Sequence, residues 1–483
     1  RTPTNPPTPT HTALPTATAT PTASPSPTGP PCDPLPVPES ATAIIGLQED
    51  GTFLGHNGRR AGGIGETLVL DAVSQAIEVH PSLPIAYVSA SGRGGRQIHV
   101  VDVDRLEVVQ TVANVNVQGE AVLAADGSRL FVPEGSRERV AVFAVAADGS
   151  LLQEADLRIG DRVVALHGSA DGTTLWAGLF TEGELVAVDL ATLEVRKRVT
   201  LGQGAWDILE LPERDDLWIS DLAGDSIAVV DTNTEEVVAS IEPGSNPARM
   251  ARNGDGSVVW VPIGNGDVVV ALDSASRSER GRVQVTEADL LDAAGMPLPH
   301  SNPNAIAYEP TTNRLFVTRG TDNAVSVLDA DSLALLGSFP TLWWPTDIAI
   351  PASAPGRLLV TEGQGGGIDP EPNDAGERSD INNGTLTRIE LSTLDLPATT
   401  ELVQQNQLRS IDRYPSHSPP DNFPIPVRDG IRSPIEHVIL VVKENKKFDA
   451  LFGDLDLPGV DAEPSLTRWT EDIVPNHRKL ARD

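Results

Sequence analysis

A carboxylate and an amide, Glu444 and Asn445, directly follow an apolar run near the end of the sequence. The run, Val438 to Val442, holds five aliphatic residues, four of them β-branched, which is typical of a strand buried on both faces of a parallel sheet. Ligands gather beyond the carboxyl ends of such strands, and these two side chains suit a hard or borderline divalent cation. Glu444 and Asn445 are therefore candidate metal ligands, which need further ligands from elsewhere.

A second set of charged residues occupies the same position in several copies of a repeat of about forty residues, which is described below. Its members lie eleven residues before an aromatic residue, or twelve before Leu359 in the last copy: Glu120, Asp207, Arg249 and Asp347. The next residue is apolar in every copy, so strand alternation places the apolar side chains between repeats and the charged ones toward a central channel. We predict either a ring of solvated charges at the channel mouth or a site for a small cation or polar ligand.

A third cluster of oxygen ligands lies in the Gly-rich segment 363–384. Its carboxylates are Asp369, Glu371, Asp374, Glu377 and Asp380. They are numerous enough to bind calcium, although they lack the alternate-residue spacing and turn glycine of a calcium hand. Both a calcium site and a plain solvated loop remain open.

The elements that must position the channel residues are repeats of about forty residues. Seven apolar pairs mark them, with spacings of 44, 45, 42, 42, 56 and 43: Tyr87-Val88, Phe131-Val132, Trp176-Ala177, Trp218-Ile219, Trp260-Val261, Phe316-Val317 and Leu359-Val360. A later strand in most copies ends in an aspartate: Asp102, Asp189, Asp231, Asp273 and Asp329. This period without helical periodicity is that of a four-stranded propeller blade.

The sequence therefore predicts an all-β fold, a seven-bladed β-propeller over residues 41–405. Strand-like segments at Ala43 to Leu47 and Leu68 to Leu70 precede the first copy, and they are expected to complete the last blade and close the ring.

The regions outside the propeller differ in composition. Residues 1–40 are rich in Thr and Pro and predict a disordered stalk, as on cell surfaces, while 406–433 reads as a Pro-rich linker. The start at Arg1, without a signal sequence, favours a processed extracellular or cell-surface protein. Residues 434–483 form a short C-terminal α/β segment.

Composition excludes several partners. The net charge is −32, from 36 Lys and Arg against 68 Asp and Glu, which argues against nucleic acid as a partner. No run approaches 18 uninterrupted apolar residues, so we expect no membrane span. Cys32 is the single cysteine, which leaves no intrachain disulfide.

The C-terminal run resembles the opening of the bacterial phosphoesterase domain of acid phosphatases and phospholipases C, in the alkaline-phosphatase superfamily. The likeness runs from Glu444 through Lys446-Lys447-Phe448-Asp449, Phe452-Gly453-Asp454-Leu455 and Val474-Pro475-Asn476-His477. It implies a catalytic divalent metal held by Glu444 and Asn445, and a phosphate ester substrate. The hydroxyl nucleophile and the later aspartates of that family are not found before Asp483, so this catalytic unit is expected to be truncated and inactive alone.

The repeats resemble the bacterial surface-layer propellers named after a Tyr-Val-Thr-Asn motif. The matching segments are Tyr87-Val88-Ser89-Ala90, Phe316-Val317-Thr318-Arg319 and Leu359-Val360-Thr361-Glu362. Proteins of this type often carry the phosphoesterase domain directly after the propeller, which agrees with the order of the two resemblances here.

Three function classes remain open. The first is a secreted or surface-attached, metal-dependent phosphoesterase whose propeller positions the substrate or a partner. The second is a non-catalytic extracellular propeller that binds a protein or glycan. The third is a propeller enzyme of the lactonase type, which needs a histidine, an arginine and carboxylates at the channel mouth. Glu120, Asp207 and Arg249 meet only part of that need, because no histidine shares their position.

Overall fold

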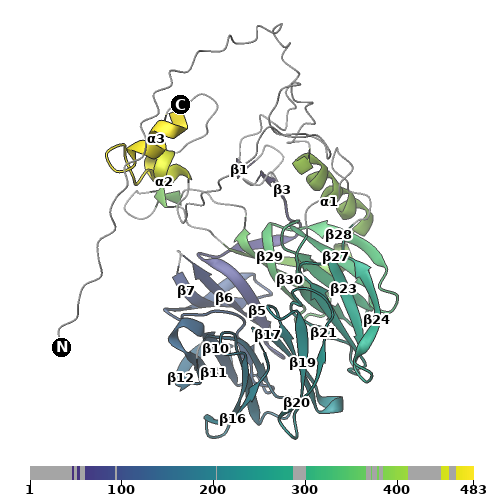
Figure 1. Ribbon diagram of the computed structural model, residues 1–483. Helices are drawn as coiled ribbons and strands as arrows, with labels where there is room; N and C mark the ends of the chain where they lie inside the picture. The colour runs from purple at the N-terminus through teal and green to yellow at the C-terminus, as the bar shows by residue number, and fades with distance from the viewer. Residues whose placement is uncertain are drawn as a thin grey trace, which may run out of the picture. The chain divides into compact units, whose positions relative to one another are not determined.

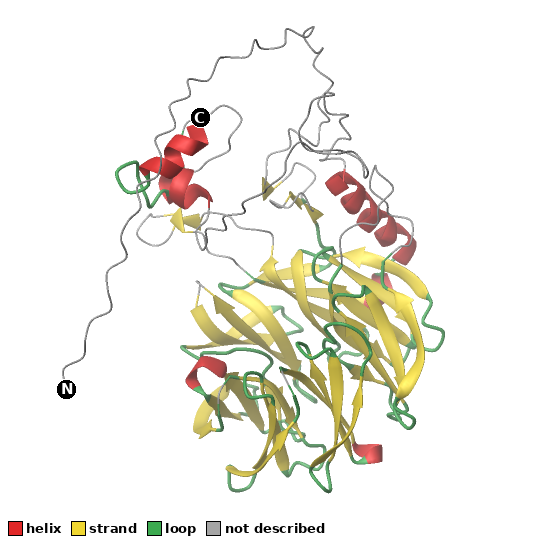
Figure 2. Cartoon of the chain, in the orientation of Figure 1, coloured by secondary structure: helices red, strands yellow, loops and turns green. Residues whose placement is uncertain are grey.

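Strands dominate the computed structural model, which describes residues 46–47, 52–54, 60–92, 95–160, 162–202, 204–286, 301–365, 371–372, 378–379, 384–411, 448–455 and 464–482 (Figure 2). All of them belong to the second of two compact units, Pro38–Asp483. Seven four-stranded antiparallel sheets follow one another along the chain. The predicted all-β, seven-bladed propeller is therefore confirmed.

The first four blades are continuous in sequence. Blade 1 holds β5 (Val73–Val79), β6 (Ile85–Gly92), β7 (Gly95–Asp102) and β8 (Glu107–Ala113). Blade 2 holds β9 (Val122–Leu123), β10 (Arg129–Glu134), β11 (Arg139–Val145) and β12 (Leu151–Arg158). Blade 3 holds β13 (Val163–Gly168), β14 (Thr174–Leu179), β15 (Glu184–Asp189) and β16 (Glu194–Thr200). Blade 4 holds β17 (Ala205–Leu211), β18 (Asp216–Asp221), β19 (Ser226–Asp231) and β20 (Glu236–Ile241).

The last three blades include the one that closes the ring. Blade 5 holds β21 (Ala251–Arg252), β22 (Val258–Ile263), β23 (Val268–Asp273) and β24 (Ser278–Gln284). Blade 6 holds β25 (Pro303–Glu309), β26 (Arg314–Arg319), β27 (Ala324–Asp329) and β28 (Leu335–Pro340). Blade 7 holds β29 (Trp343–Ala349), β30 (Arg357–Gly365), β33 (Thr385–Glu390) and β4 (Glu66–Val69).

Ring closure uses the segment just before the first blade. Strand β4 pairs with β33, with Leu68 opposite Leu386, so the chain's early and late parts share blade 7. The green strands β29 and β30 accordingly lie beside the purple β5 (Figure 1). The expectation for Leu68 to Leu70 is confirmed, apart from a shift in the strand bounds.

The other segment expected in blade 7 is placed elsewhere. β1 (Gly46–Leu47) pairs with β2 (Phe53–Leu54), which also pairs with β3 (Arg60–Ala61). Of the segment Ala43 to Leu47, only Gly46–Leu47 lies within the described residues, and the expectation that it completes the last blade was wrong. Blade 7 already has four strands with β4, and the short hairpin instead packs Phe53 against Trp343, with ring centroids 5.4 Å apart.

The core consists of apolar layers between consecutive blades. The layer between blades 7 and 1, for example, combines Leu359 and Leu386 with Ile77 and Val88. The predicted apolar position is buried in every copy: Ile77, Ala121, Leu166, Ile208, Met250, Ile306 and Ile348. Burial of these layers in a closed ring supplies the main hydrophobic stabilisation of the fold.

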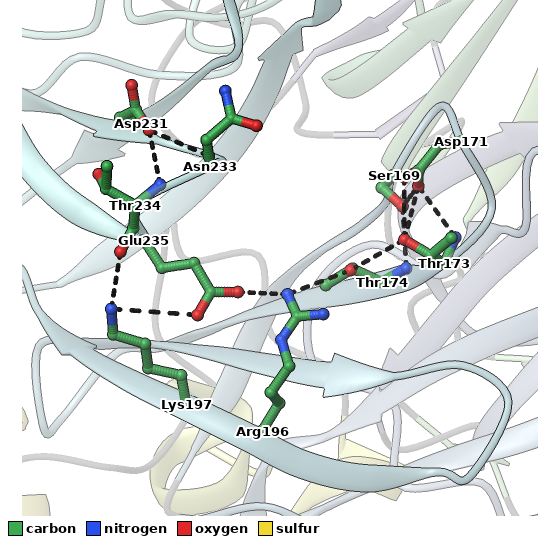
Figure 3. A network of polar contacts seen from close by, with 10 residues as sticks. All are labelled: Ser169, Asp171, Thr173, Thr174, Arg196, Lys197, Asp231, Asn233, Thr234 and Glu235. Carbon is green, nitrogen blue, oxygen red and sulfur yellow. Dashed lines mark hydrogen bonds and ion pairs between the residues drawn. The ribbon is translucent and has the colours of Figure 1, made fainter.

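The recurring aspartates cap the outer hairpins. The Asp231 carboxylate accepts the backbone N–H groups of Asn233 and Thr234 at 3.0 and 2.7 Å, and Glu235 then takes a left-handed conformation (Figure 3). Lys197 of blade 3 donates to the Thr234 carbonyl at 2.9 Å, and Arg196 pairs with Glu235, which ties the two blades. The aspartate repeat thus has a structural role.

A helix that the sequence analysis did not predict covers the outer strand of blade 6. Helix α1 (Leu396–Ile411) packs on β28, where Thr400 Oγ1 accepts the Ser338 N–H at 2.8 Å. Gly337 has φ +150°, and a Cβ there would lie 2.6 Å from that oxygen, so only glycine leaves room for the helix. The helix continues past residue 405.

Short helices lie in the C-terminal segment: α2 (Phe448–Phe452) and α3 (Pro475–Arg482). The paired strands β31 (Glu371–Pro372) and β32 (Arg378–Ser379) lie in the Gly-rich segment. Among the helices of the described residues, none has the length and apolarity to cross a membrane.

Candidate ligand-binding cavity on the propeller axis

A cavity of about 680 Å³ is lined by residues from all seven blades, which places it on the propeller axis. Three of the four predicted channel residues, Glu120, Asp207 and Arg249, lie on its wall. The fourth, Asp347, is 5 % exposed and does not line the cavity, but it forms an ion pair with Arg249. The structure thus brings the predicted set together around one guanidinium.

Two of these carboxylates also join neighbouring blades. Asp207 Oδ2 accepts the Met250 N–H at 2.8 Å, and Asp347 Oδ2 accepts the Ile77 N–H at 3.0 Å. In both cases the N–H donor belongs to the apolar residue that follows the matching position of the next blade. Part of the charge at this position therefore has a structural use, as a hydrogen-bonded tie between blades.

Arg249 is shared between carboxylates. Its Nε lies 3.6 Å from Glu120 Oε2, while its other contact is the ion pair with Asp347. Burial acts to lower the pKa of Arg249, but the charges of Asp347 and Glu120 outweigh it and raise that pKa. Arg249 therefore stays protonated, and its positive charge is paired with carboxylates of the protein.

The acidic groups respond to the same surroundings. Burial raises the pKa of Glu120 well above its ordinary value, against the lowering effect of Arg249 and with a further rise from Asp347. Burial likewise raises the pKa of Asp207, against its hydrogen bond from Met250. Glu120 consequently keeps its proton to higher pH than a solvated glutamate does.

Bulges in the innermost strands supply cavity residues that sequence reasoning missed. In five blades the pairing register shifts just before the predicted position, which leaves one extra residue: Gln75, Val164, Trp206, Asn304 and Thr346. All five line the cavity. A bulge re-aims side chains, so strand alternation alone did not point to these extra residues, and the predicted positions Ala76 and Ala305 are buried.

The backbone ahead of the channel position shows a second regularity in blades 3 to 7. Three residues ahead of the predicted position, blades 3 to 7 all have positive φ, at Arg162 (39°), Gly204 (83°), Asn246 (59°), Asn302 (52°) and Trp344 (64°). Glycine and asparagine take this conformation readily, whereas arginine and tryptophan do so rarely. Of these five residues, Arg162 and Trp344 are the two that line the cavity.

Both exceptional residues are held by specific contacts. The Trp344 N–H donates to Asn323 Oδ1 at 2.9 Å, and its side chain is 37 % exposed. The Arg162 guanidinium lies 5.1 Å from the ring centroid of Phe180. The preceding tryptophan is placed differently: Trp343 is 6 % exposed and packs against Phe53.

The other predicted sites lie largely outside the described residues. Glu444 and Asn445 do so, as do Asp369, Asp374, Glu377 and Asp380 of the segment 363–384, in which Glu371 begins β31. Within the described parts of the chain, no group of three or more His, Cys, Asp or Glu side chains could hold a metal ion. The metal and calcium hypotheses stay predictions.

Comparison with known proteins supports the fold alone. No known protein family and no curated protein matches the sequence. Among solved structures, a chain titled Kuenenia stuttgartiensis Hydrazine Synthase is similar with a TM-score of 0.53 and 17 % identity, covering 68 % of this chain and 97 % of that one. In all, 1708 chains match, which is expected of a widely used architecture and decides no function.

Proposed function

We propose that this protein is a non-catalytic binding propeller that holds a small polar ligand in its axial cavity. The observation that carries the proposal is the cavity to which all seven blades contribute. Bulky residues such as Leu106 and Leu193 also take left-handed φ at the outer hairpins, so what sets Arg162 and Trp344 apart is that their side chains line this cavity.

The cavity also has the general properties of a ligand site. Its volume of about 680 Å³ falls within the roughly 300–1,000 Å³ typical of small-molecule sites. Tryptophan, amide, hydroxyl and charged groups converge on it, which suits oriented binding. The lactonase hypothesis gains nothing, because no histidine lines the cavity among the described residues.

Ligand-observed NMR on the full chain tests this function. The probes are a library of small neutral, cationic and anionic molecules, recorded with the natural protein, with Trp344→Ala and with Leu152→Ala. Leu152 is 74 % exposed on β12 and serves as the control. We expect saturation transfer to at least one probe, lost in Trp344→Ala and kept in Leu152→Ala. If no probe in the library shows this behaviour, the proposed binding function is wrong.

A second candidate function rests on the C-terminal segment. There we propose that the propeller belongs to an extracellular, metal-dependent phosphoesterase acting on a phosphate ester, with Glu444 and Asn445 as metal ligands. Support comes from the helix α2, which begins at Phe448, three residues after Asn445, where the resemblance expects a helix to follow the ligands. Arg478 of α3 is 2 % exposed and pairs with Asp454, so this segment has packing of its own.

Hydrolysis of an aryl phosphate ester tests the second candidate. It is measured with and without divalent metal and chelator, on this chain and on any longer form read from the source DNA. We expect activity in a longer form that is lost on chelation and in Glu444→Ala but kept in Glu436→Ala. Activity that survives chelation and Glu444→Ala would contradict the assigned ligands.

A further inference from the structure

Two tryptophans supply the aromatic groups of the cavity wall, beside aliphatic residues such as Val73 and Val164. Trp206 comes from the bulge in β17 of blade 4 and Trp344 from β29 of blade 7, and each is 37 % exposed. Blades 4 and 7 are three apart in a ring of seven, so the two indoles approach the axis from well-separated directions. A ligand between them can contact both apolar faces while its edges meet polar groups.

Three ligand classes pack on an indole face: an aromatic or organic cation, an anion with an apolar part, and the C–H face of a sugar ring. The charges at the cavity discriminate among them. The wall carries both signs: the guanidinium groups of Arg162 and Arg249 lie on it with the carboxyl groups of Glu120 and Asp207, and Asp347 pairs with Arg249.

These mixed charges leave little net attraction for a charged ligand. An anion would meet the carboxyl groups of Glu120 and Asp207 as well as Arg162, and Arg249 is already paired with Glu120 and Asp347. A cation would meet Arg162 and Arg249 as well as those carboxyl groups. A neutral ligand avoids both the like-charge contact and the desolvation of an ion, which costs several kcal/mol by the usual order of magnitude.

The remaining polar groups suit hydroxyls. Gln75 and Gln118 line the cavity with amide groups, which donate and accept hydrogen bonds, and Ser91 adds a hydroxyl. Amide and hydroxyl groups of this kind pair with ligand hydroxyls, which also both donate and accept.

From these contacts we infer that the cavity binds a neutral saccharide of a few rings, with sugar faces against Trp206 and Trp344 and hydroxyls on Gln75 and Gln118. The inference rests on the proposed binding function and specifies its ligand class. Trp344, held in its strained backbone by the surrounding ring, is a specificity-determining residue of this site.

Isothermal titration calorimetry on the full chain tests the ligand class. The neutral probes are maltotriose, cellotriose and tri-N-acetylchitotriose, and the charged probes of similar size are the deacetylated, cationic chitotriose and the anionic trigalacturonate. We expect a neutral trisaccharide to bind, and Trp206→Ala and Trp344→Ala each to weaken it more than about tenfold, as expected for loss of a stacked aromatic face. Trp344→Phe and Leu152→Ala should stay within about threefold of the natural protein.

Other outcomes separate the ligand class from the binding function. Binding of only a charged trisaccharide, lost in Trp344→Ala, would overturn the saccharide's neutrality and leave the axial binding site standing. Neutral binding that neither tryptophan variant weakens would place the sugar elsewhere and overturn the inference. If no trisaccharide binds, the ligand class is overturned. If the NMR library also gives no probe that depends on Trp344, the binding function falls with it.

Discussion

The outer hairpins and the channel ends of the blades are built by the same repeat, yet they differ in how strictly it is kept. In five blades the outer hairpin has an aspartate that accepts backbone N–H groups, followed four residues later by a left-handed residue. At the channel end the backbone repeats its bulge and its positive φ, while the side chains vary from glycine to tryptophan. The position that stabilises the ring thus has the same side chain in five blades, whereas the position near the cavity has different side chains.

Tryptophan substitutions should separate the two regions by the largest margin. Trp218 is fully buried between blades 4 and 5, so Trp218→Ala should lower the free energy of unfolding by about 3–5 kcal/mol. Trp206→Ala, in the bulge of the same blade's innermost strand, should cost about 1 kcal/mol or less. Urea unfolding measures both. Equal losses would erase the distinction between core and cavity tryptophans.

A buried acid sharpens the comparison through pH. Glu362 is 0 % exposed, accepts hydrogen bonds from Thr385 and Thr387 at 2.7 and 3.1 Å, and has no cationic partner among the described residues. Burial raises its pKa from 4.5 to about 7, despite these hydrogen bonds. The folded state therefore holds a proton that the unfolded state releases above pH 4.5, and stability falls as the pH rises through 7.

The expected loss from this group is about 3 kcal/mol between pH 4.5 and pH 8, and Glu362→Gln should remove it. Urea unfolding of both proteins at pH 5 and pH 8 gives the measurement, because the difference between them cancels other titrating groups. The matching position of blade 6, Arg319, lies 3.4 Å from Asp322 and offers the contrast of a buried charge with a partner. The same pH dependence in Glu362→Gln would show that another group is responsible.

Loss of one hairpin cap should have a smaller effect. Asp231→Ala removes the acceptor for two backbone N–H groups on an exposed turn, and we expect a loss of about 1 kcal/mol in the free energy of unfolding. Ligand affinity should not change, since the turn does not line the cavity. Calorimetric melting measures the first quantity and titration the second. A shift in affinity would link regions that the comparison separates.

The sequence predicted the fold because blade periodicity is a local signal repeated seven times. Spacing located every blade, and the apolar position after each channel residue is buried throughout. It placed Glu120, Asp207 and Arg249 on one cavity for the same reason. Ring closure by β4 could be predicted because each blade needs four strands and the last copy lacked one. Gly46–Leu47 was misplaced because a strand of two residues is too short to show an alternating pattern.

The cavity's tryptophans could not be found by alternation. A bulge adds a residue without changing composition, so Trp206 and Thr346 were hidden one place before the predicted position. The one usable signal was positional: asparagine or glycine three residues ahead of the channel position in blades 4 to 6, replaced by Arg162 and Trp344 in blades 3 and 7. Helix α1 was missed because its docking depends on Gly337 of a distant strand.

Substitution of Trp344 by glycine tests the central claim most directly, because it keeps the left-handed backbone and removes the indole. Asn302→Gly, at the same place in blade 6, is the matched control. Relief of the backbone strain offsets the lost packing, so we expect both variants to stay within about 1 kcal/mol of the natural protein in unfolding free energy. Only Trp344→Gly should lose ligand binding. A loss of several kcal/mol with binding intact would instead assign Trp344 to the framework of the ring and contradict this account.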